Sequence, residues 1–353
     1  MKQPETPRPT IRDVARRAGV SVATVSRVMN GHPDVSDATR EAVLQQIRED
    51  NYVTSRGARG LAGGRTGLIA LTVPFMHPEY FAQIVEGAAE ALYERDARFV
   101  LCPTAHEHDR EVSLLGRVMH GTTDGAVLIL PSESNDELVR LQQHGYPFIV
   151  VDPSVPLDPD IPTVAAANWS GARTATEHLL ALGHRRITAI SGPANWSASM
   201  DRVAGYHSAL MAAGVPPGAE QVVEADFTVE GGYRVAKELL QTADPPTAVF
   251  ALNDNMATGV LQAAKDLGYE VPEELSIVGF DDIALASISS PALTTVRQPL
   301  LEMGRMAASL LGRLIDGQPL EATRLELSTR LVVRESTAKP RQVMGQSGAE
   351  KAS

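Results

Sequence analysis

Cysteine and long apolar runs are scarce in this sequence. Cys102 is the only cysteine among 353 residues, which excludes an internal disulfide and a cysteine-rich zinc site and is typical of the cytosol. No stretch approaches the roughly 20 apolar residues that a membrane span needs. The first ten residues, MKQPETPRPT, contain no apolar segment of a secretory signal. We therefore expect a cytoplasmic protein with no membrane association.

Basic charge is also scarce, except at the beginning of the chain. The formal net charge of −11 argues against nucleic-acid binding when the chain is taken as a whole. Residues 1–66, however, carry eleven Lys or Arg and seven Asp or Glu, so this region is net +4 and the remaining residues are together net −15. The segregation predicts a small segment that faces a polyanion, followed by a large acidic body of more than one domain.

The basic region is expected to begin with a short helix. Apolar residues at positions 11, 14, 15 and 18 follow the i, i+3, i+4, i+7 spacing of one helix face. Thr10 is a candidate N-cap with Asp13 at the capping-box position, and Gly19 suits the turn that would end this helix.

Two further helices are predicted after this turn. The second is expected to begin near Ser21 and to stop at Asn30 and Gly31, and the third to begin at Ser36. Two short helices joined by a tight turn and packed on a third form a helix-turn-helix headpiece. The residues predicted to face inward on the second and third helices are Val25, Val28, Met29, Ala42, Val43 and Ile47.

A different pattern starts after the Gly- and Arg-rich linker YVTSRGARGLAGGRTG. From Gly67 on, stretches of helix length alternate with the apolar runs LIALTV, RFVLC, GAVLIL, FIVVD, ITAIS, TAVFAL and LSIVGF. Such runs are typical of parallel strands covered on both faces, and seven are too many for one nucleotide-binding unit. The predicted fold class is therefore α/β with two doubly wound parallel-sheet subdomains. Two segments, VRQPLLEMGRMAASLLGRLI and RLELSTRLVVRES, are expected to close the fold, and the polar residues beyond Arg334 to be disordered.

Five segments, in this order, resemble the lactose/galactose-repressor (LacI) family of bacterial transcription regulators. They are IRDVARRAGVSVATVSRVMNG, ARGLAGGRTGLIAL, GPANWSASMDRVAGYHSAL, FALNDNMATGVLQA and LSIVGFDDIALASISSPALTTVRQP, and they span about Thr10 to Arg334. The resemblance implies a DNA-binding headpiece, a hinge helix and a ligand-sensing core like that of periplasmic sugar-binding proteins. The implied ranges are 8–54 for the headpiece, 55–66 for the hinge or linker, 67–337 for the core and 338–353 for a disordered tail. Within the core, the N-subdomain is expected to take about 67–167 plus 296–326, and the C-subdomain about 168–295 plus 327–337.

The second helix is the candidate recognition helix, because its N-terminal residues face the major groove in this geometry. By match to the family motif, Val22, Ala23 and Arg27 occupy base-reading positions. Arg can bind guanine O6 and N7, whereas Val and Ala offer only apolar contact, for example to a thymine methyl. The alternative is a small helical bundle with a solvated polar face. Phosphate contacts are implied for Thr10, Ser21, Thr24, Ser26 and Asn30.

The linker matches the family's hinge pattern in SRGARGLAGG. Leu61 matches the leucine that wedges into the minor groove at the operator centre, and Ala58 matches the hinge residue beside it. Gly57 and Gly60 would each cost about 1 kcal/mol in a helix relative to Ala. We therefore expect a hinge helix that forms only when DNA and a partner hinge hold it, with a flexible linker as the alternative.

Polar residues end three of the predicted strands, at the edge where ligands of such folds bind between subdomains. Asp152, Asn253 and Asp281 stand at these ends, and Arg202 lies in the helix after ITAISGP. Carboxylate, amide and guanidinium groups suit adjacent sugar hydroxyls. The family resemblance places Arg202, Asn253 and Asp281 at effector-binding positions, whereas Pro153 stands where the family often has Arg.

Aromatic residues complete the predicted ligand site. By the resemblance, Phe227 matches an aromatic that lies against the ligand ring, and Tyr80 and Phe81 match the aromatic pair on the other lip. Trp196 has no firm family counterpart, but an aromatic face there could stack on a sugar. A purely structural role, such as strand-end capping, is the alternative for Asp152, Trp196, Asn253 and Asp281.

No pattern in the sequence predicts catalysis. The HEH at residues 106–108 is short and has no further ligands nearby, so a solvated loop is favoured over a metal site. GGRT in the linker fails the P-loop pattern because Arg65 stands where the motif needs Lys, and there is no G-x-S-x-G motif. We expect no catalytic residue, no cofactor and no metal.

These observations together predict a homodimeric, ligand-responsive transcription regulator that acts as a repressor. Two headpieces related by a two-fold axis would read a pseudo-palindromic double-stranded DNA operator. The small-molecule effector is expected to be a carbohydrate, a sugar or oligosaccharide, with a purine or nucleoside as the alternative. Two other classes of protein remain as alternatives. The headpiece argues against a stand-alone sugar-binding protein of the same core fold, and the missing catalytic motif argues against a sugar-converting enzyme.

Overall fold

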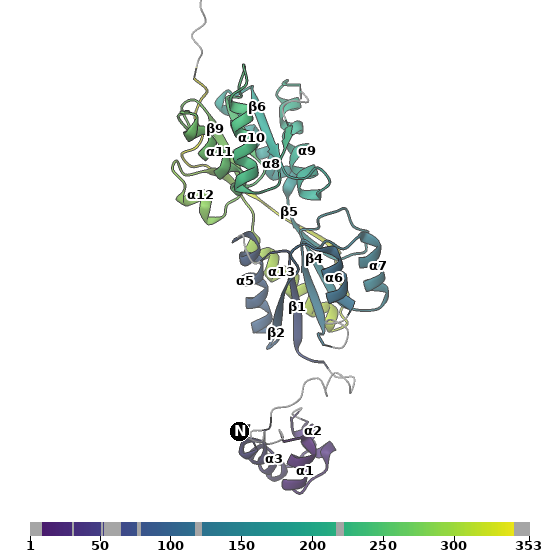
Figure 1. Cartoon of the computed structure of the whole chain (residues 1–353). Coiled ribbons are helices and arrows are strands. Elements are labelled where there is room, and N and C mark those ends of the chain that lie inside the picture. The colour runs from purple at the N-terminus through teal and green to yellow at the C-terminus, as the bar shows by residue number, and fades with distance from the viewer. Residues whose placement is uncertain are drawn as a thin grey trace, which may run out of the picture. The chain divides into compact units, whose positions relative to one another are not determined.

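The computed structural model describes residues 9–29, 32–50, 52, 65–75, 79–116, 122–216 and 222–341. The chain divides into two compact units, Met1–Thr66 and Gly67–Ser353 (Figure 1). Three predicted DNA-contact residues, Asn30, Ala58 and Leu61, lie outside the described residues, as does most of the expected hinge. Within the described ranges, no helix is both long and apolar enough to cross a membrane.

The first unit contains the three predicted helices, α1 (Ile11–Arg17), α2 (Val22–Met29) and α3 (Asp37–Glu49). The capping box is confirmed, because Thr10 accepts from the Asp13 backbone N–H while the Asp13 side chain accepts from the Thr10 N–H. The helices pack around a small apolar cluster of Val14, Ala15, Val25, Val28 and Val43.

One residue of the predicted headpiece core is wrong. Ala42 is exposed, because the buried line of α3 runs through Val43 and continues four residues later at Ile47, which packs on the same cluster. Ala42 lies about 100° away from that line around the helix.

The first sheet of the second unit has six strands in the order β11-β5-β4-β3-β1-β2, and every adjacent pair is parallel. Its strands are β1 (Leu68–Val73), β2 (Arg98–Pro103), β3 (Gly125–Ile129), β4 (Phe148–Val151), β5 (Thr163–Ala166) and β11 (Arg324–Leu327). The accompanying helices are α5 (Glu79–Glu94), α6 (His108–Leu114), α7 (Asn135–Gln143) and α13 (Leu300–Ile315).

Both faces of this sheet are buried, as the continuous apolar runs predicted. Along β3, Val127 and Ile129 join one apolar cluster with residues of α5 and α13, while Ala126 and Leu128 join another that includes Leu138 of α7. Alternate residues of a strand point to opposite faces, so a strand covered on both sides must be apolar throughout.

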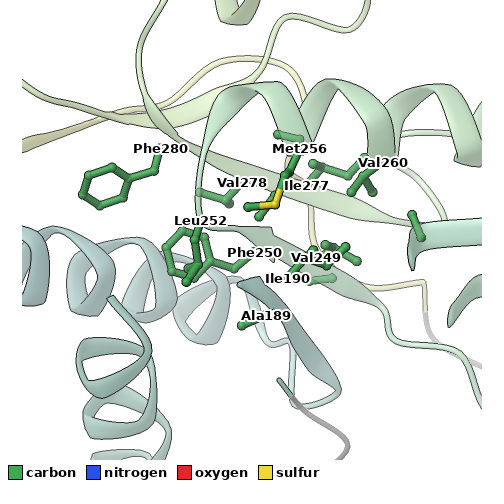
Figure 2. Packing of buried hydrophobic residues seen from close by; sticks show 14 of the residues in the cluster. Ala189, Ile190, Val249, Phe250, Leu252, Met256, Val260, Ile277, Val278 and Phe280 are labelled. Atoms are coloured by element: carbon green, nitrogen blue, oxygen red, sulfur yellow. The ribbon is translucent and has the colours of Figure 1, made fainter. Parts of the chain in front are cut away.

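The second sheet also has six strands, in the order β12-β10-β9-β8-β6-β7. All its pairs are parallel except β10 with β12. Its strands are β6 (Ile187–Ser191), β7 (Val222–Glu224), β8 (Ala248–Ala251), β9 (Ser276–Asp281), β10 (Thr294–Arg297) and β12 (Arg330–Val332). The accompanying helices are α8 (Asn168–Leu182), α9 (Ser197–Ala212), α10 (Val229–Leu240), α11 (Asp254–Asp266) and α12 (Ala284–Ile288). Figure 2 shows its core, in which Phe250 and Val278 of the central strands pack with Met256 and Val260 of α11.

The chain passes between the two sheets three times, at residue 167 after β5, at residues 298–299 after β10, and at residues 328–329 between β11 and β12. We call the part around the first sheet the N-subdomain and the part around the second sheet the C-subdomain. The second crossover differs from the predicted boundary near residue 296, because β10 runs to Arg297 and pairs with β9. Helix α13, directly after it, belongs to the N-subdomain and packs on α5.

The predicted disordered tail is wrong for its first residues. Ser336 is fully buried and its Oγ donates to the Ile277 carbonyl of β9, and the Ala338 carbonyl accepts from His184. The Ser336 carbonyl also accepts from the Ile277 N–H of β9 at 2.8 Å, so this polar segment is ordered by hydrogen bonds to the strand. Residues 342–353 lie outside the described residues.

Candidate functional site

The headpiece presents its three candidate base-reading residues on the outside of α2. Val22, Ala23 and Arg27 are exposed, and Val22 retains 41% of its accessible surface although it is apolar. Arg27 forms a 3.2 Å ion pair with Asp34, and both side chains are more than half exposed. A surface pair of this kind contributes little to stability, so the guanidinium is available for exchange onto another acceptor.

Two of the predicted phosphate contacts also have a local structural role. The Ser21 Oγ accepts from the Thr24 backbone N–H at 3.0 Å and lies 2.8 Å from the Thr24 hydroxyl, which caps the start of α2. Thr10 serves α1 in the same way. Each cap satisfies the backbone N–H of the third helical residue, and the other N–H groups of a first helical turn are the kind of donor that binds phosphate at helix N-termini.

A cavity of about 480 Å³ lies between the two subdomains, within the range of about 300–1,000 Å³ that small-molecule sites occupy. The structure brings all eight predicted ligand residues to its wall, namely Tyr80, Phe81, Asp152, Trp196, Arg202, Phe227, Asn253 and Asp281. Sequence reasoning missed further lining residues, which are Phe75, Leu130, Pro153, Ser154, Ala198, Asp226, Thr228, Val229, Glu230, Asn255 and Ile283.

Two carboxyl groups in this wall are almost completely buried. Asp281, at the end of β9, lies 3.6 Å from the Arg202 guanidinium, and Asp152, at the end of β4, accepts a 2.7 Å hydrogen bond from the Tyr80 hydroxyl. Burial raises the pKa of Asp281 to about 7, although the Arg202 charge acts in the opposite direction. Burial likewise raises the pKa of Asp152, and Arg202 again opposes the shift.

Arg202 is held rigidly in α9. Its Nε donates to the Asn168 Oδ1 at 2.8 Å, its Nη1 donates to the Leu252 carbonyl, and its guanidinium lies 3.9 Å from the centre of the Phe280 ring. Of the described residues that line the cavity, it is the one Lys or Arg. These contacts fix the orientation of its planar guanidinium at the cavity wall.

Asn253 caps a helix and also lines the cavity, so both roles expected from its sequence position are present. Its Oδ1 accepts from the Met256 backbone N–H at 2.9 Å and caps α11, and its Nδ2 donates to the Phe227 carbonyl at 3.0 Å. An amide has two donors and two acceptor lone pairs, so one of each remains for a ligand.

Aromatic rings from both subdomains meet the cavity in two pairs. In the N-subdomain, Tyr80 and Phe81 pack edge to face with ring centres 5.2 Å apart. In the C-subdomain, Trp196 and Phe227 lie 5.6 Å apart at 37°. The Phe227 ring passes so close to Gly192 that a Cβ there would be 2.0 Å from it, so this position accommodates only glycine.

The two lips of the cavity touch each other. The Glu79 carboxylate at the start of α5 accepts from the Ala284 backbone N–H at 2.8 Å, and the Ser197 N–H donates to the Ser154 carbonyl at 2.9 Å. Ile283 of the C-subdomain is only 2% exposed and belongs to the apolar cluster of the N-subdomain. The two subdomains are therefore in direct contact beside the cavity.

The HEH segment has other partners. The His106 ring packs edge-on against Trp196 with centres 5.5 Å apart, and the His108 ring binds the Ser132 carbonyl and Glu137. Over the part of the chain that the structure describes, no group of three or more His, Cys, Asp or Glu side chains could hold a metal ion.

Two family models match the chain. One is described as "Bacterial regulatory proteins, lacI family" and matches residues 10–55. The other is described as a periplasmic binding protein-like domain and matches residues 176–337. The first covers the helix-turn-helix unit and the second most of the C-subdomain together with all of α13.

Relatives extend the similarity to nearly all of the chain. The HTH-type transcriptional regulator CelR of Thermobifida fusca is 40% identical over 338 residues, which are 93% of this chain and 98% of that protein. A solved complex of the transcriptional regulator CelR with cellobiose has a TM-score of 0.71 at 38% identity and covers 93% of this chain and 100% of that one. The lac repressor dimer bound to operator and the anti-inducer ONPF has a TM-score of 0.83 at 29% identity, over 94% and 99% of the two chains.

Proposed function

The chain belongs to the lacI family of bacterial regulatory proteins, and on this premise we propose that its cavity binds a neutral sugar of two rings that controls operator binding by the headpiece. As a member of this family it is a DNA-binding transcription regulator and not an enzyme, and regulators of this kind act as dimers on operator DNA. We place its action in the cytoplasm, where the bacterial chromosome lies.

The observation that carries this proposal is the chemistry of the cavity wall. Four carboxyl side chains, those of Asp152, Asp226, Glu230 and Asp281, line the cavity against the single guanidinium of Arg202. Sugar hydroxyls hydrogen-bond well to carboxyl groups, whereas a phosphate or carboxylate ligand would be repelled by each of these groups that is ionised. A neutral, hydroxyl-rich ligand therefore suits this wall best.

The two aromatic pairs support a ligand with two rings. Tyr80 with Phe81 and Trp196 with Phe227 come from different subdomains, so each pair is able to face one sugar ring. The cellobiose in the CelR complex is such a disaccharide. Closure of the two lips over the ligand would link occupancy of the cavity to the relation of the subdomains, and through it to the hinge.

Titration calorimetry on the purified protein tests the ligand. We expect cellobiose or another neutral disaccharide to bind more tightly than glucose, ribose, hypoxanthine or a sugar phosphate. Asp281→Asn should weaken this binding, while the matched control Asp160→Asn, on an exposed side chain, should not. Tight binding of hypoxanthine or adenosine with no response to any disaccharide would replace the sugar by a purine ligand.

Operator binding is tested in the same preparation. The protein should bind a pseudo-palindromic site as a dimer, and a saturating disaccharide should change that affinity in one direction or the other. An operator affinity that stays constant with the cavity filled would contradict the regulatory part of the proposal.

A further inference from the structure

The second crossover between the subdomains is bonded directly to the ligand cavity. Gln298, its first residue, is only 3% exposed. Its Nε2 donates to the Asp281 Oδ1 at 2.6 Å, and its backbone N–H donates to the Asp281 carbonyl at 3.2 Å. One residue of the crossover therefore holds both the side chain and the backbone of a residue in the cavity wall.

The backbone of the cavity wall is strained at the residues next to Gln298. Asp281 and Asp282 have φ angles of 112° and 60°, in the left-handed region that non-glycine residues rarely adopt. Asp282 accepts hydrogen bonds from Arg297 and, at 2.6 Å, from Arg334. The last residue of β10 and the first residue of the crossover thus bind two consecutive strained residues, the last residue of β9 and the one after it. Strained backbone persists only where its surroundings determine it, so the crossover is part of what defines this corner.

We propose that Gln298 is a positioning residue, which aims the Asp281 carboxylate into the cavity and makes its orientation depend on the path of the crossover. The proposal deepens the proposed sugar site and rests on it for the identity of the ligand. Gln298 does not line the cavity itself, so its effect on a ligand must pass through Asp281.

The geometry of the Gln298 amide supports this role. Its Oε1 has no hydrogen-bond partner among the described residues, although the atom is buried. Leaving a buried polar atom without a hydrogen-bond partner costs free energy of folding. The conformation of this side chain is therefore not explained by its own hydrogen bonds alone. Only the orientation with Nε2 toward Asp281 gives the carboxylate a donor. When the lips separate, rotation at residues 298–299 changes the direction of this side chain and with it the support of the carboxylate.

The charged groups around Asp281 define what a loss of Gln298 would do. Arg202 of α9 faces it as a cation, Asp152 of β4 and Asp254 of α11 face it as carboxyls, and Tyr80 of α5 faces it as a phenol. Burial raises the pKa of Asp281, and the hydrogen bond from Gln298 lowers it together with Arg202. Without the Nε2 donor, Asp281 should therefore hold its proton to higher pH.

The first test needs no ligand. The ¹³C carboxyl signal of Asp281, assigned with Asp281→Asn, is titrated in the full-length protein and in Gln298→Met, which keeps the volume but removes the donor. We expect the midpoint to rise by about 0.5–1 pH unit. Gln298→Glu should raise it further, because a second carboxylate faces the first. Gln142→Met, which removes an exposed 2.9 Å hydrogen bond to the Asp160 carbonyl, is the matched control and should leave it unchanged. An unchanged midpoint in both Gln298 variants overturns the proposal.

The second test measures the response to sugar. The ratio of operator Kd values with and without saturating cellobiose is compared for the full-length wild type, Gln298→Met and Gln142→Met. We expect the ratio to fall at least fivefold toward unity in Gln298→Met only, within the range of about 5–150-fold that allosteric coupling spans. A wild type that does not respond to cellobiose removes the sugar assignment, while the titration still decides the role of Gln298. A shifted midpoint with an unchanged ratio overturns the link to the crossover.

Discussion

The headpiece and the core differ in where their candidate functional residues lie. In the headpiece, the candidate base-reading residues are exposed, and a separate apolar cluster of five buried residues holds the helices together. In the core, Asp152, Arg202 and Asp281 are each at most 6% exposed and line the cavity, and Arg202 forms an ion pair with Asp281. Function and stability should therefore be separable by mutation in the headpiece and coupled in the core.

Arg202→Ala should have the largest effect and tests whether function and stability are coupled in the core. Removing one partner of a buried ion pair costs about 3–5 kcal/mol, and here the Asn168 and Leu252 acceptors lose their donor as well. Urea unfolding should show this loss, and sugar binding should disappear with it. The loss should be smaller at pH 6 than at pH 8, because a lone Asp281 can take up a proton. Arg186→Ala, which removes an exposed ion pair with Asp244, should cost less than about 0.5 kcal/mol. A stable Arg202→Ala protein that merely fails to bind sugar would show that the core also separates the two properties.

Glu133→Gln tests whether stability can change in the core without function, because Glu133 is buried and does not line the cavity. Burial and a hydrogen bond to Glu111 raise its pKa to about 9. The folded state thus binds a proton that the unfolded state releases near pH 4.5, so this group stabilises fully below that pH and its contribution is lost as pH rises through about 9. The wild type should lose up to about 1.4 kcal/mol of unfolding free energy per pH unit relative to Glu133→Gln between pH 6 and 9. Sugar affinity should not change. If the unfolding free energies of the two proteins ran parallel over this pH range, Glu133 would not be the group that binds the proton.

Arg27→Ala tests the separation in the headpiece. Operator binding should weaken by about 1–3 kcal/mol, concentrated at one base pair of each half-site, while headpiece unfolding and sugar affinity stay as they are. Arg16→Ala, on the exposed side of α1, provides the matched loss of one positive charge. Equal weakening on every DNA sequence would reduce Arg27 to a phosphate contact.

Thr10→Ala should give the smallest effect on stability. Thr10 is both a helix cap and a predicted phosphate contact, so function and stability are hardest to separate at this residue. Loss of the capping box should cost the headpiece about 1 kcal/mol. Thr10→Ser keeps the hydroxyl and should behave as wild type in thermal unfolding. If the alanine variant loses operator affinity without losing stability, Thr10 acts on DNA alone.

The sequence predicted the fold wherever burial leaves a periodic trace. The seven apolar runs correspond to seven strands, and six of these are buried along almost their whole length. The seventh, β2, lies at the sheet edge and is mostly exposed or half-buried. The remaining strands are short and carry polar residues. In β11 the side chains alternate between exposed and half-buried at the sheet edge, so RLEL contains no apolar run to detect. The boundary near residue 296 failed for a related reason, since TTVR offers a single apolar residue.

The candidate site was predictable in part, because the carboxyl ends of parallel strands converge. Asp152, Asn253 and Asp281 follow buried runs and could be found in this way. Asp226 and Glu230 follow the three-residue strand β7, which gives no such signal. The partners of Gln298 could not be predicted either, because the contact depends on how a crossover passes a corner 17 residues away along the chain.

The position of Trp196 also determines what the intrinsic tryptophan fluorescence of the protein can report. The chain has two tryptophans, and the other, Trp169, lies 41% exposed on α8 with the Arg173 guanidinium 5.5 Å from its ring centre. In Trp169→Phe protein, all indole fluorescence would come from the wall of the cavity, between His106 and Phe227. A sugar that displaces water from that ring would shift the emission to shorter wavelength, so the protein would report its own occupancy without a label.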